Sequence, residues 1–221
     1  MQINRYQVIV FDLDGTLVDS VPDLSLAINH ALAVQGWSDV QENEVREWVG
    51  NGSLKLAERT LERLNLLTQE NLEALHGQFL QSYKKFLCEK SVLYSGVKPL
   101  LRNLKDQNKV LVVLTNKPMA FVPDLLAKLE IADYFDWVLG GDSFEKKKPD
   151  PLPMVKILQH YNIAANQCLM VGDSRSDVVC AQQANVDSVA LLQGYHQGID
   201  LASLKPTYLF ADMAEFAQTV I

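Results

Sequence analysis

Short apolar runs that alternate with helix-like segments constrain the fold of this chain more than any other feature of its sequence. Continuous short apolar runs are typical of strands buried on both faces, as in parallel sheets. Strands that alternate with helices indicate βαβ units. We therefore expect an α/β fold, in which helices cover both faces of a doubly wound parallel sheet. The predicted strands comprise residues 8–11, 110–114, 137–139, 168–171, 188–192 and 208–210.

Residues 20–88 interrupt this alternation, because they contain helical patterns and no strand-like run. Ser20 predicts the N-cap of a helix with Pro22 in its first turn, where proline is tolerated. Ser53 predicts the N-cap of a second helix, and a third helical pattern follows it. An all-helical cap inserted into an α/β core is therefore the predicted organisation. Its segments are core residues 1–18, cap residues 19–88 and core residues 89–221.

The composition excludes several classes of function. The chain has 20 basic and 27 acidic residues, and its formal charge of −7 disfavours a general nucleic-acid binder, which needs excess Lys and Arg. No apolar run approaches the roughly 18 residues of a membrane helix. The three cysteines lie far apart without a CxxC pair, which favours reduced thiols in a cytoplasmic protein. We expect a small-molecule ligand and neither a nucleic-acid nor a membrane partner, while the oligomeric state cannot be read from the sequence.

Two carboxylates follow the first predicted strand directly, in the motif Asp12-Leu13-Asp14-Gly15-Thr16. Alternate residues of an extended segment point the same way, so Asp12 and Asp14 can converge. Open α/β sheets bind ligands at the carboxyl ends of their strands, where this motif lies. Carboxylates this close repel each other, which calls for a cation or a shared proton. An ordinary acidic turn is the alternative for the motif taken alone.

Polar side chains also follow the other central strands. Thr115 and Asn116 come after the second predicted strand. Asp173 and Asp177 follow the fourth and are four residues apart, so we expect the next helix to present both on one side. Lys148 ends a run of three lysines before a proline. Each element alone can be a helix cap, a turn or a solvated charge, and for Lys146 and Lys147 we retain the solvated interpretation.

Taken together and in this order, these motifs resemble those of the haloacid dehalogenase (HAD) superfamily of phosphohydrolases. The resemblance rests on DxDGT at 12–16, Thr115, Lys148 of KPDP and GDSxxD at 172–177. It covers essentially the whole chain and implies a Rossmann-like core, with the cap between the first two motifs. Within the superfamily the chain resembles the phosphoglycolate phosphatases, which implies 2-phosphoglycolate as substrate. The residues that carry this second resemblance are 11–24, 48–52 and 114–118.

The resemblance also implies roles for the motif residues. Asp12 is the expected nucleophile, and Asp14 is the expected general acid and then general base. Mg²⁺ is expected on Asp12, on Asp173 and on the backbone carbonyl of Asp14, with Asp177 orienting water around the ion. The phosphoryl oxygens are expected to be held by Thr115, Lys148 and the backbone N–H of Asn116.

The segment Gly50-Asn51-Gly52 lies between two predicted cap helices and has two interpretations. It is a flexible turn, or it closes over the site and reads the leaving group, with Asn51 donating to a small carboxylate. Lys55 and Arg59 share one helix face and are further candidates for a substrate carboxylate. Solvent exposure is the alternative for both.

Other functions stay open beside phosphoglycolate hydrolysis. These are a phosphatase for another small substrate such as a sugar phosphate or pyrophosphate, a phosphosugar mutase, and a non-catalytic sensor of a phosphorylated ligand. Dehalogenation is disfavoured because that reaction needs neither Asp14 to protonate an alkoxide nor Asp173 to hold a metal. Phosphonate cleavage would need a Schiff-base lysine over the site, for which Lys55 is the available candidate.

Overall fold

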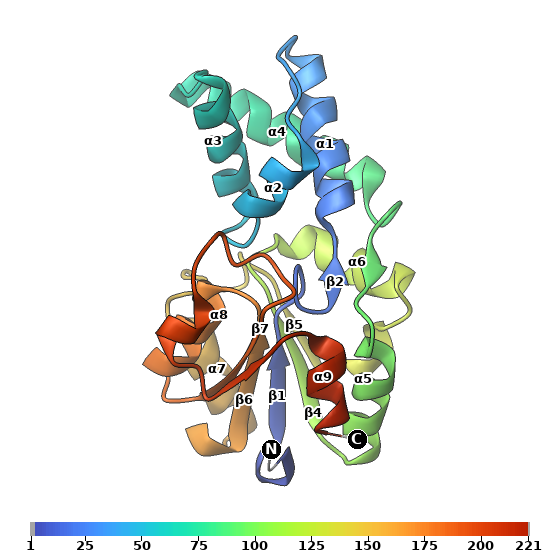
Figure 1. Cartoon of the computed structure of the whole chain (residues 1–221), viewed down its shortest axis with the longest axis vertical. Helices are drawn as coiled ribbons and strands as arrows, with labels where there is room; N and C mark the ends of the chain where they lie inside the picture. The colour runs from blue at the N-terminus through green and yellow to red at the C-terminus, as the bar shows by residue number, and fades with distance from the viewer. Residues whose placement is uncertain (1–2, 221) are drawn as a thin grey trace.

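The computed structural model describes residues 3–220 and contains a six-stranded parallel sheet in the order β5-β4-β1-β6-β7-β8 (Figure 1). The α/β fold with a doubly wound parallel sheet is therefore confirmed. β1 lies at the centre, between the strands that precede the other two polar motifs. The strands are β1 (Val8–Phe11), β4 (Val110–Leu114), β5 (Trp137–Leu139), β6 (Cys168–Gly172), β7 (Asp187–Leu191) and β8 (Tyr208–Phe210).

Helices cover both faces of the sheet because both faces are apolar. Ile9 and Phe11 of β1 belong to the larger core cluster, while Val8 and Val10 belong to a second cluster on the opposite face. This alternation follows from the two-residue period of a strand. The first face is covered by α5 (Val97–Asp106), α6 (Val122–Lys128) and α9 (Met213–Gln218), and the second by α7 (Leu152–Tyr161) and α8 (Arg175–Gln183). Short 3-10 helices comprise Ile3–Arg5, Met119–Phe121, Ala132–Tyr134, Ala165–Gln167 and Leu201–Leu204.

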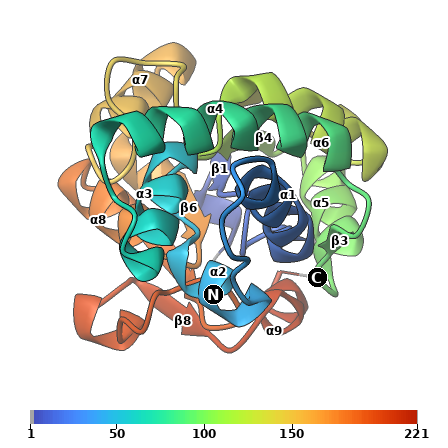
Figure 2. The same ribbon diagram turned by 90° about the horizontal axis from the view of Figure 1, so that it is seen from above.

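Four helices form a separate layer beyond the carboxyl end of the sheet, as Figures 1 and 2 show. They are α1 (Val21–Val34), α2 (Glu42–Trp48), α3 (Ser53–Leu64) and α4 (Gln69–Phe86), and α1 packs along α4. The sequence patterns predict three of them but not α2, whose only buried residue is Val45. The sequence feature that could have indicated α2 is its capping box, in which Gln41 N donates to Glu44 Oε2 at 2.9 Å.

Two short strands connect this helical insert to the core. β2 (Val18–Asp19) pairs antiparallel with β3 (Val92–Leu93), so the chain enters and leaves the insert at neighbouring points. Neither strand is predicted from the sequence, because two residues are too few to show a pattern. Among the helices of residues 3–220, none combines the length and the apolar character needed to cross a membrane.

The helix starts differ from the predicted ones in their chemistry. Ser20 stands at the N-cap of α1, but its side chain makes no capping bond, because its hydroxyl donates to Asp14 Oδ1 at 2.5 Å. Ser53 is the first residue of α3 and Gly52 is its N-cap, so the prediction that Ser53 caps this helix is wrong. The Ser53 hydroxyl instead lies 2.9 Å from His76 Nε2 of α4. Both serines therefore contribute tertiary contacts in place of caps.

Candidate active site

Three buried carboxylates meet at the carboxyl end of β1 and β6. Asp12, Asp173 and Asp177 each offer an oxygen, and these oxygens lie within 4.8 Å of one another. Asp173 lies between β6 and α8, so the expectation that the helix presents both acids on one side is wrong for this residue. Convergence needs the absence of a side chain at Gly172, the last residue of β6, because an added Cβ there would lie 2.3 Å from Asp177 Cγ.

Lys148 is the cation that the structure brings to these acids. Its Nζ lies 2.9 Å from Asp12 Oδ1 and 2.6 Å from Asp177 Oδ1, and it donates to Leu114 O at 2.6 Å. The side chain is buried, so these contacts replace the water that the ammonium loses. The neighbouring lysines point elsewhere, since Lys146 pairs with Asp150 and Lys147 donates to Asn51 O at 2.9 Å.

The three acids carry more negative charge than Lys148 can neutralise. Burial, opposed by Lys148, raises the pKa of Asp12 from 3.8 to about 7. Burial, with the charges of Asp12 and Asp177, raises the pKa of Asp173 well above its ordinary value. Asp12 Oδ1 also has no well-aligned hydrogen-bond donor among residues 3–220, although Lys148 lies close to it. Three carboxylates against one ammonium leave a formal charge of −2, which fits a divalent cation.

The remaining contacts of Asp173 hold its carboxylate in place. Thr16 Oγ1 donates to Oδ1 at 2.6 Å, and the backbone N–H of Tyr195 donates to Oδ2 at 2.6 Å. Gly15 and Gly194 allow this approach, because an added Cβ at either would lie 2.2 or 2.1 Å from Asp173 Oδ2. The oxygens of Asp177 are engaged by Lys148 and by Ser174, whose N and Oγ lie 3.0 and 2.6 Å from Oδ2.

Asp14 lies beside this cluster and forms a separate ion pair with Lys117. Lys117 Nζ is 2.8 Å from both carboxylate oxygens, and Ser20 Oγ donates to one of them. Burial by itself would lower the pKa of Lys117, but Asp14 raises it above its ordinary value. The sequence motifs predict no role for Lys117. Its position two residues after Thr115 was the available signal, since a lysine buried at a strand end needs an anionic partner.

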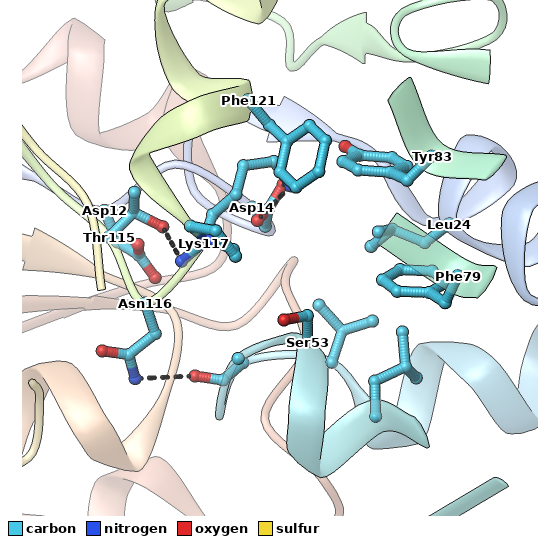
Figure 3. A pocket seen from close by; sticks show the side chains of 15 residues that line it. Asp12, Asp14, Leu24, Ser53, Phe79, Tyr83, Thr115, Asn116, Lys117 and Phe121 are labelled. Atoms are coloured by element: carbon cyan, nitrogen blue, oxygen red, sulfur yellow. Dashed lines mark hydrogen bonds and ion pairs between the residues drawn. The ribbon is translucent and has the colours of Figure 1, made fainter. Parts of the chain in front are cut away.

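A small cavity of about 40 Å³ opens beside Asp12 and Asp14, between the core and the helical insert (Figure 3). Thr115 lines it, and the Lys117 backbone N–H donates to Thr115 Oγ1 at 3.2 Å. Apart from Ser53, the side chains from the insert are apolar or aromatic, and the charged lining residues belong to the core, which also adds Pro118 and Phe121 to the apolar side. The apolar and aromatic lining residues are Leu24, Val49, Leu56, Phe79, Tyr83, Pro118 and Phe121.

The loop between α2 and α3 closes one edge of this cavity. Gly50 and Gly52 line the cavity, and Asn116 Nδ2 donates to Gly50 O at 3.0 Å and to Lys148 O at 3.0 Å (Figure 3). The Asn116 amide group therefore connects the insert to the core. An added Cβ on Gly52 would lie 3.2 Å from Asn116 O, so glycine permits the close contact.

The other predicted cap residues do not reach the cavity. Asn51 Oδ1 accepts from Arg59 Nη2 at 2.8 Å and from Gln197 Nε2 at 2.9 Å, so its side chain is occupied elsewhere. Arg59 also donates to Trp48 O at 2.6 Å, which ties the loop to α3. Lys55 pairs with Glu58 on the same helix. None of the three lines the cavity beside Asp12.

Comparisons with known proteins agree with this geometry. Residues 9–191 match the family described as haloacid dehalogenase-like hydrolase. A relative from Colwellia psychrerythraea named phosphoglycolate phosphatase is 39% identical, over 95% of each chain. One of the same name from Psychrobacter arcticus is 40% identical, over 94% of this chain and 93% of its own.

A solved structure extends the similarity to three dimensions. A crystal structure from Haemophilus somnus, described as a predicted phosphoglycolate phosphatase, superimposes with a TM-score of 0.93. It is 36% identical and covers 98% of this chain and 99% of its own. With the family match over most of the sequence and these full-length relatives, the chain belongs to the haloacid dehalogenase-like hydrolase family.

Proposed function

We propose that the chain is a Mg²⁺-dependent phosphomonoesterase that hydrolyses 2-phosphoglycolate to glycolate and phosphate. The observation that carries this proposal is the convergence of Asp12, Asp173 and Lys148 beside the cavity that Asp14 lines. The relatives named phosphoglycolate phosphatase, which match along nearly the whole chain, support the choice of substrate.

The proposed reaction has two steps, both carried by side chains of this protein. A carboxylate oxygen of Asp12 attacks phosphorus, which forms an aspartyl-phosphate and expels the glycolate alkoxide. Asp14 protonates that alkoxide and then accepts a proton from the water that cleaves the aspartyl-phosphate. Phosphate leaves and Asp12 is regenerated. In this scheme Thr115, Lys148 and the Asn116 backbone N–H hold the phosphoryl oxygens.

The proposed metal ligands are Asp12, Asp173 and the backbone carbonyl of Asp14. Mg²⁺ favours one or two carboxylates together with waters and substrate oxygens, which suits this donor set. Asp177 is proposed to act outside the first ligand shell, because Ser174 and Lys148 already occupy its oxygens. When bound, the ion would supply positive charge against the phosphoryl group and the buried acids.

Residues 19–88 are proposed to act as a cap over this site. Support comes from the Asn116–Gly50 hydrogen bond and from the cavity, which residues of both layers line. A cytoplasmic location belongs to the same proposal. It is consistent with three cysteines that are unpaired in the described part of the chain.

Phosphate release tests this function. The purified chain is assayed with 2-phosphoglycolate, several sugar phosphates and pyrophosphate, each with Mg²⁺ and with EDTA. We expect EDTA-sensitive turnover, the highest kcat/KM for 2-phosphoglycolate, and loss of turnover in Asp12→Asn. Higher kcat/KM for a sugar phosphate or pyrophosphate would refute the substrate. Absence of EDTA-sensitive turnover with every compound would favour a non-catalytic sensor.

A further inference from the structure

The apolar wall of the cavity contains one polar atom without a well-aligned hydrogen-bond partner. Tyr83 of α4 is 1% exposed, and its hydroxyl makes no well-aligned hydrogen bond among residues 3–220, although the Lys117 ammonium lies beside it and lowers its pKa against the effect of burial. Its ring stacks on Phe79 at 5.8 Å between centroids and meets Phe121 edge-on at 5.1 Å. A buried hydroxyl without a partner costs free energy, so its presence in the lining of a cavity points to a ligand.

The Tyr83 hydroxyl is available as a hydrogen-bond donor. Burial raises the pKa of Tyr83 to about 12, so the phenol keeps its proton at neutral pH. In Figure 3 the hydroxyl end of the ring points toward the Asp14 side of the cavity. The free hydroxyl therefore faces the space that a leaving group would occupy after phosphoryl transfer to Asp12.

Lys117 supplies a second donor at the same place. An ammonium group has three N–H donors, and two of those on Lys117 are used by the oxygens of Asp14. The Nζ also lies 4.8 Å from the centroid of the Tyr83 ring, so the cation and the phenol are neighbours in the cavity lining. Among the described lining residues, Lys117 is the only one with a cationic side chain.

We propose that the Tyr83 hydroxyl and the third N–H of Lys117 bind the carboxylate of the leaving group, which makes Tyr83 a specificity-determining residue. This inference rests on the proposed function. Two donors side by side suit a group with two acceptor oxygens and no donor of its own, and a carboxylate is such a group. The positive charge of Lys117 favours an anion over a neutral amide or ester.

The rest of the cavity favours a short leaving group. Its inner space is small, about 40 Å³, although one side of the cavity is open to solvent. Leu24, Leu56 and Phe79 offer no hydrogen bonds, so the several hydroxyls of a sugar would remain unpaired there. A two-carbon acid satisfies both conditions, because its single polar terminus can reach the two donors.

Tyr83→Phe tests the inference, because it removes one oxygen and keeps the stacked ring. Activity is measured with 2-phosphoglycolate and with ethyl phosphate, which has the same two carbons and no carboxylate. We expect kcat/KM for 2-phosphoglycolate to fall by about 10- to 100-fold, the worth of a hydrogen bond to a charged acceptor. This loss should exceed the loss with ethyl phosphate at least about tenfold. The melting temperature should fall little, since the hydroxyl has no well-aligned partner in the free protein besides its contact with Lys117.

Tyr94→Phe is the matched control. Tyr94 also carries a buried hydroxyl without a partner among the described residues, but it does not line the cavity. Activity with both substrates should stay at the wild-type level. Equal losses with the two substrates in Tyr83→Phe would indicate a merely structural role and overturn the inference, as would no loss at all.

A third measurement separates this inference from the proposed function. If the wild-type chain does not hydrolyse 2-phosphoglycolate, the proposed function fails. The inference is then decided by glycolate inhibition of p-nitrophenyl phosphate turnover. Glycolate should inhibit the wild type about tenfold more strongly than Tyr83→Phe. Equal inhibition of both proteins, or no inhibition of the wild type, would overturn it.

Discussion

Replacing Asp173 by asparagine should have opposite effects on metal binding and on the stability of the metal-free protein. Asparagine has the same shape and removes one of the three converging charges. Its hydrogen bonds can be kept, because Oδ1 can accept from the Tyr195 N–H while Nδ2 donates to the Thr16 hydroxyl. The variant therefore changes the charge of the site and leaves its packing intact.

The size of the effect follows from the spacing of the acids. At the 4.8 Å limit and an effective dielectric constant of about 20, each charge on Asp12 or Asp177 repels Asp173 by about 3 kcal/mol. The raised pKa of Asp173 means that partial protonation already relieves some of this repulsion. We therefore expect a gain of about 1–3 kcal/mol in the free energy of unfolding, or about 2–10 °C in Tm.

Thermal unfolding at pH 8, with EDTA and with Mg²⁺, measures both effects. The wild type should gain stability from Mg²⁺, whereas Asp173→Asn should start higher in EDTA and gain much less from the ion. Asp106→Asn is the control, because Asp106 is exposed and lies on α5, outside the acidic cluster. A variant that is less stable than the wild type in EDTA, or that keeps the full Mg²⁺ shift, would contradict this account of the site.

Further predictions concern the same cluster and its supports. Since the pKa of Asp12 rises from 3.8 to about 7, the metal-free fold binds more protons than the unfolded chain in that range. Urea unfolding in EDTA should thus show stability falling as pH rises from about 4 to 7, and a rise would refute this. Gly15→Ala would place a Cβ 2.2 Å from Asp173 Oδ2, at a residue whose φ of +89° also disfavours a side chain. Titration calorimetry should therefore show that this variant no longer binds Mg²⁺. Mg²⁺ affinity equal to that of the wild type would contradict the geometry. Tyr195→Phe removes the hydrogen bond from the Tyr195 hydroxyl to Asp19 and should cost about 1–3 kcal/mol of stability. Mg²⁺-dependent turnover should be preserved, because the backbone N–H of residue 195 still donates to Asp173. Loss of that turnover would contradict the assignment of Asp173 support to the backbone N–H alone.

The sheet could be predicted from the sequence because burial on both faces leaves a local pattern in each strand. Four of the six strands have the predicted bounds, and the others differ by one residue. The pair β2–β3 could not be predicted, since it depends on residues 18–19 meeting residues 92–93. A local sequence pattern predicts which face of a segment is buried, but it does not predict which distant segment pairs with it.

The candidate site was likewise predictable only in part from the sequence. Asp12, Asp173 and Lys148 converge as expected, because each follows a strand of one parallel sheet or lies in a loop beside it. The ion pair of Asp14 with Lys117 joins residues 103 positions apart, so the position of Lys117 at a strand end indicates that it needs an anionic partner but not that Asp14 is that partner. Arg59 is one candidate from the sequence for a substrate carboxylate, with solvent exposure as the alternative, and its guanidinium instead donates to Trp48 O at the end of α2.

The pairing of β2 with β3 has a consequence for how the chain folds. Because β2 and β3 are paired, the two ends of the insert lie next to each other, and residues 20–91 form one closed loop attached to the core. The entropy of closing a flexible loop grows only logarithmically with its length, by about 0.6 kcal/mol per doubling. Formation of the β1–β4 pair, which spans the insert, is therefore penalised little by the insert's length. As far as loop closure is concerned, helices could therefore be added to or removed from this loop at little cost, so the residues that the insert contributes to the cavity can diverge separately from the acids held by the core.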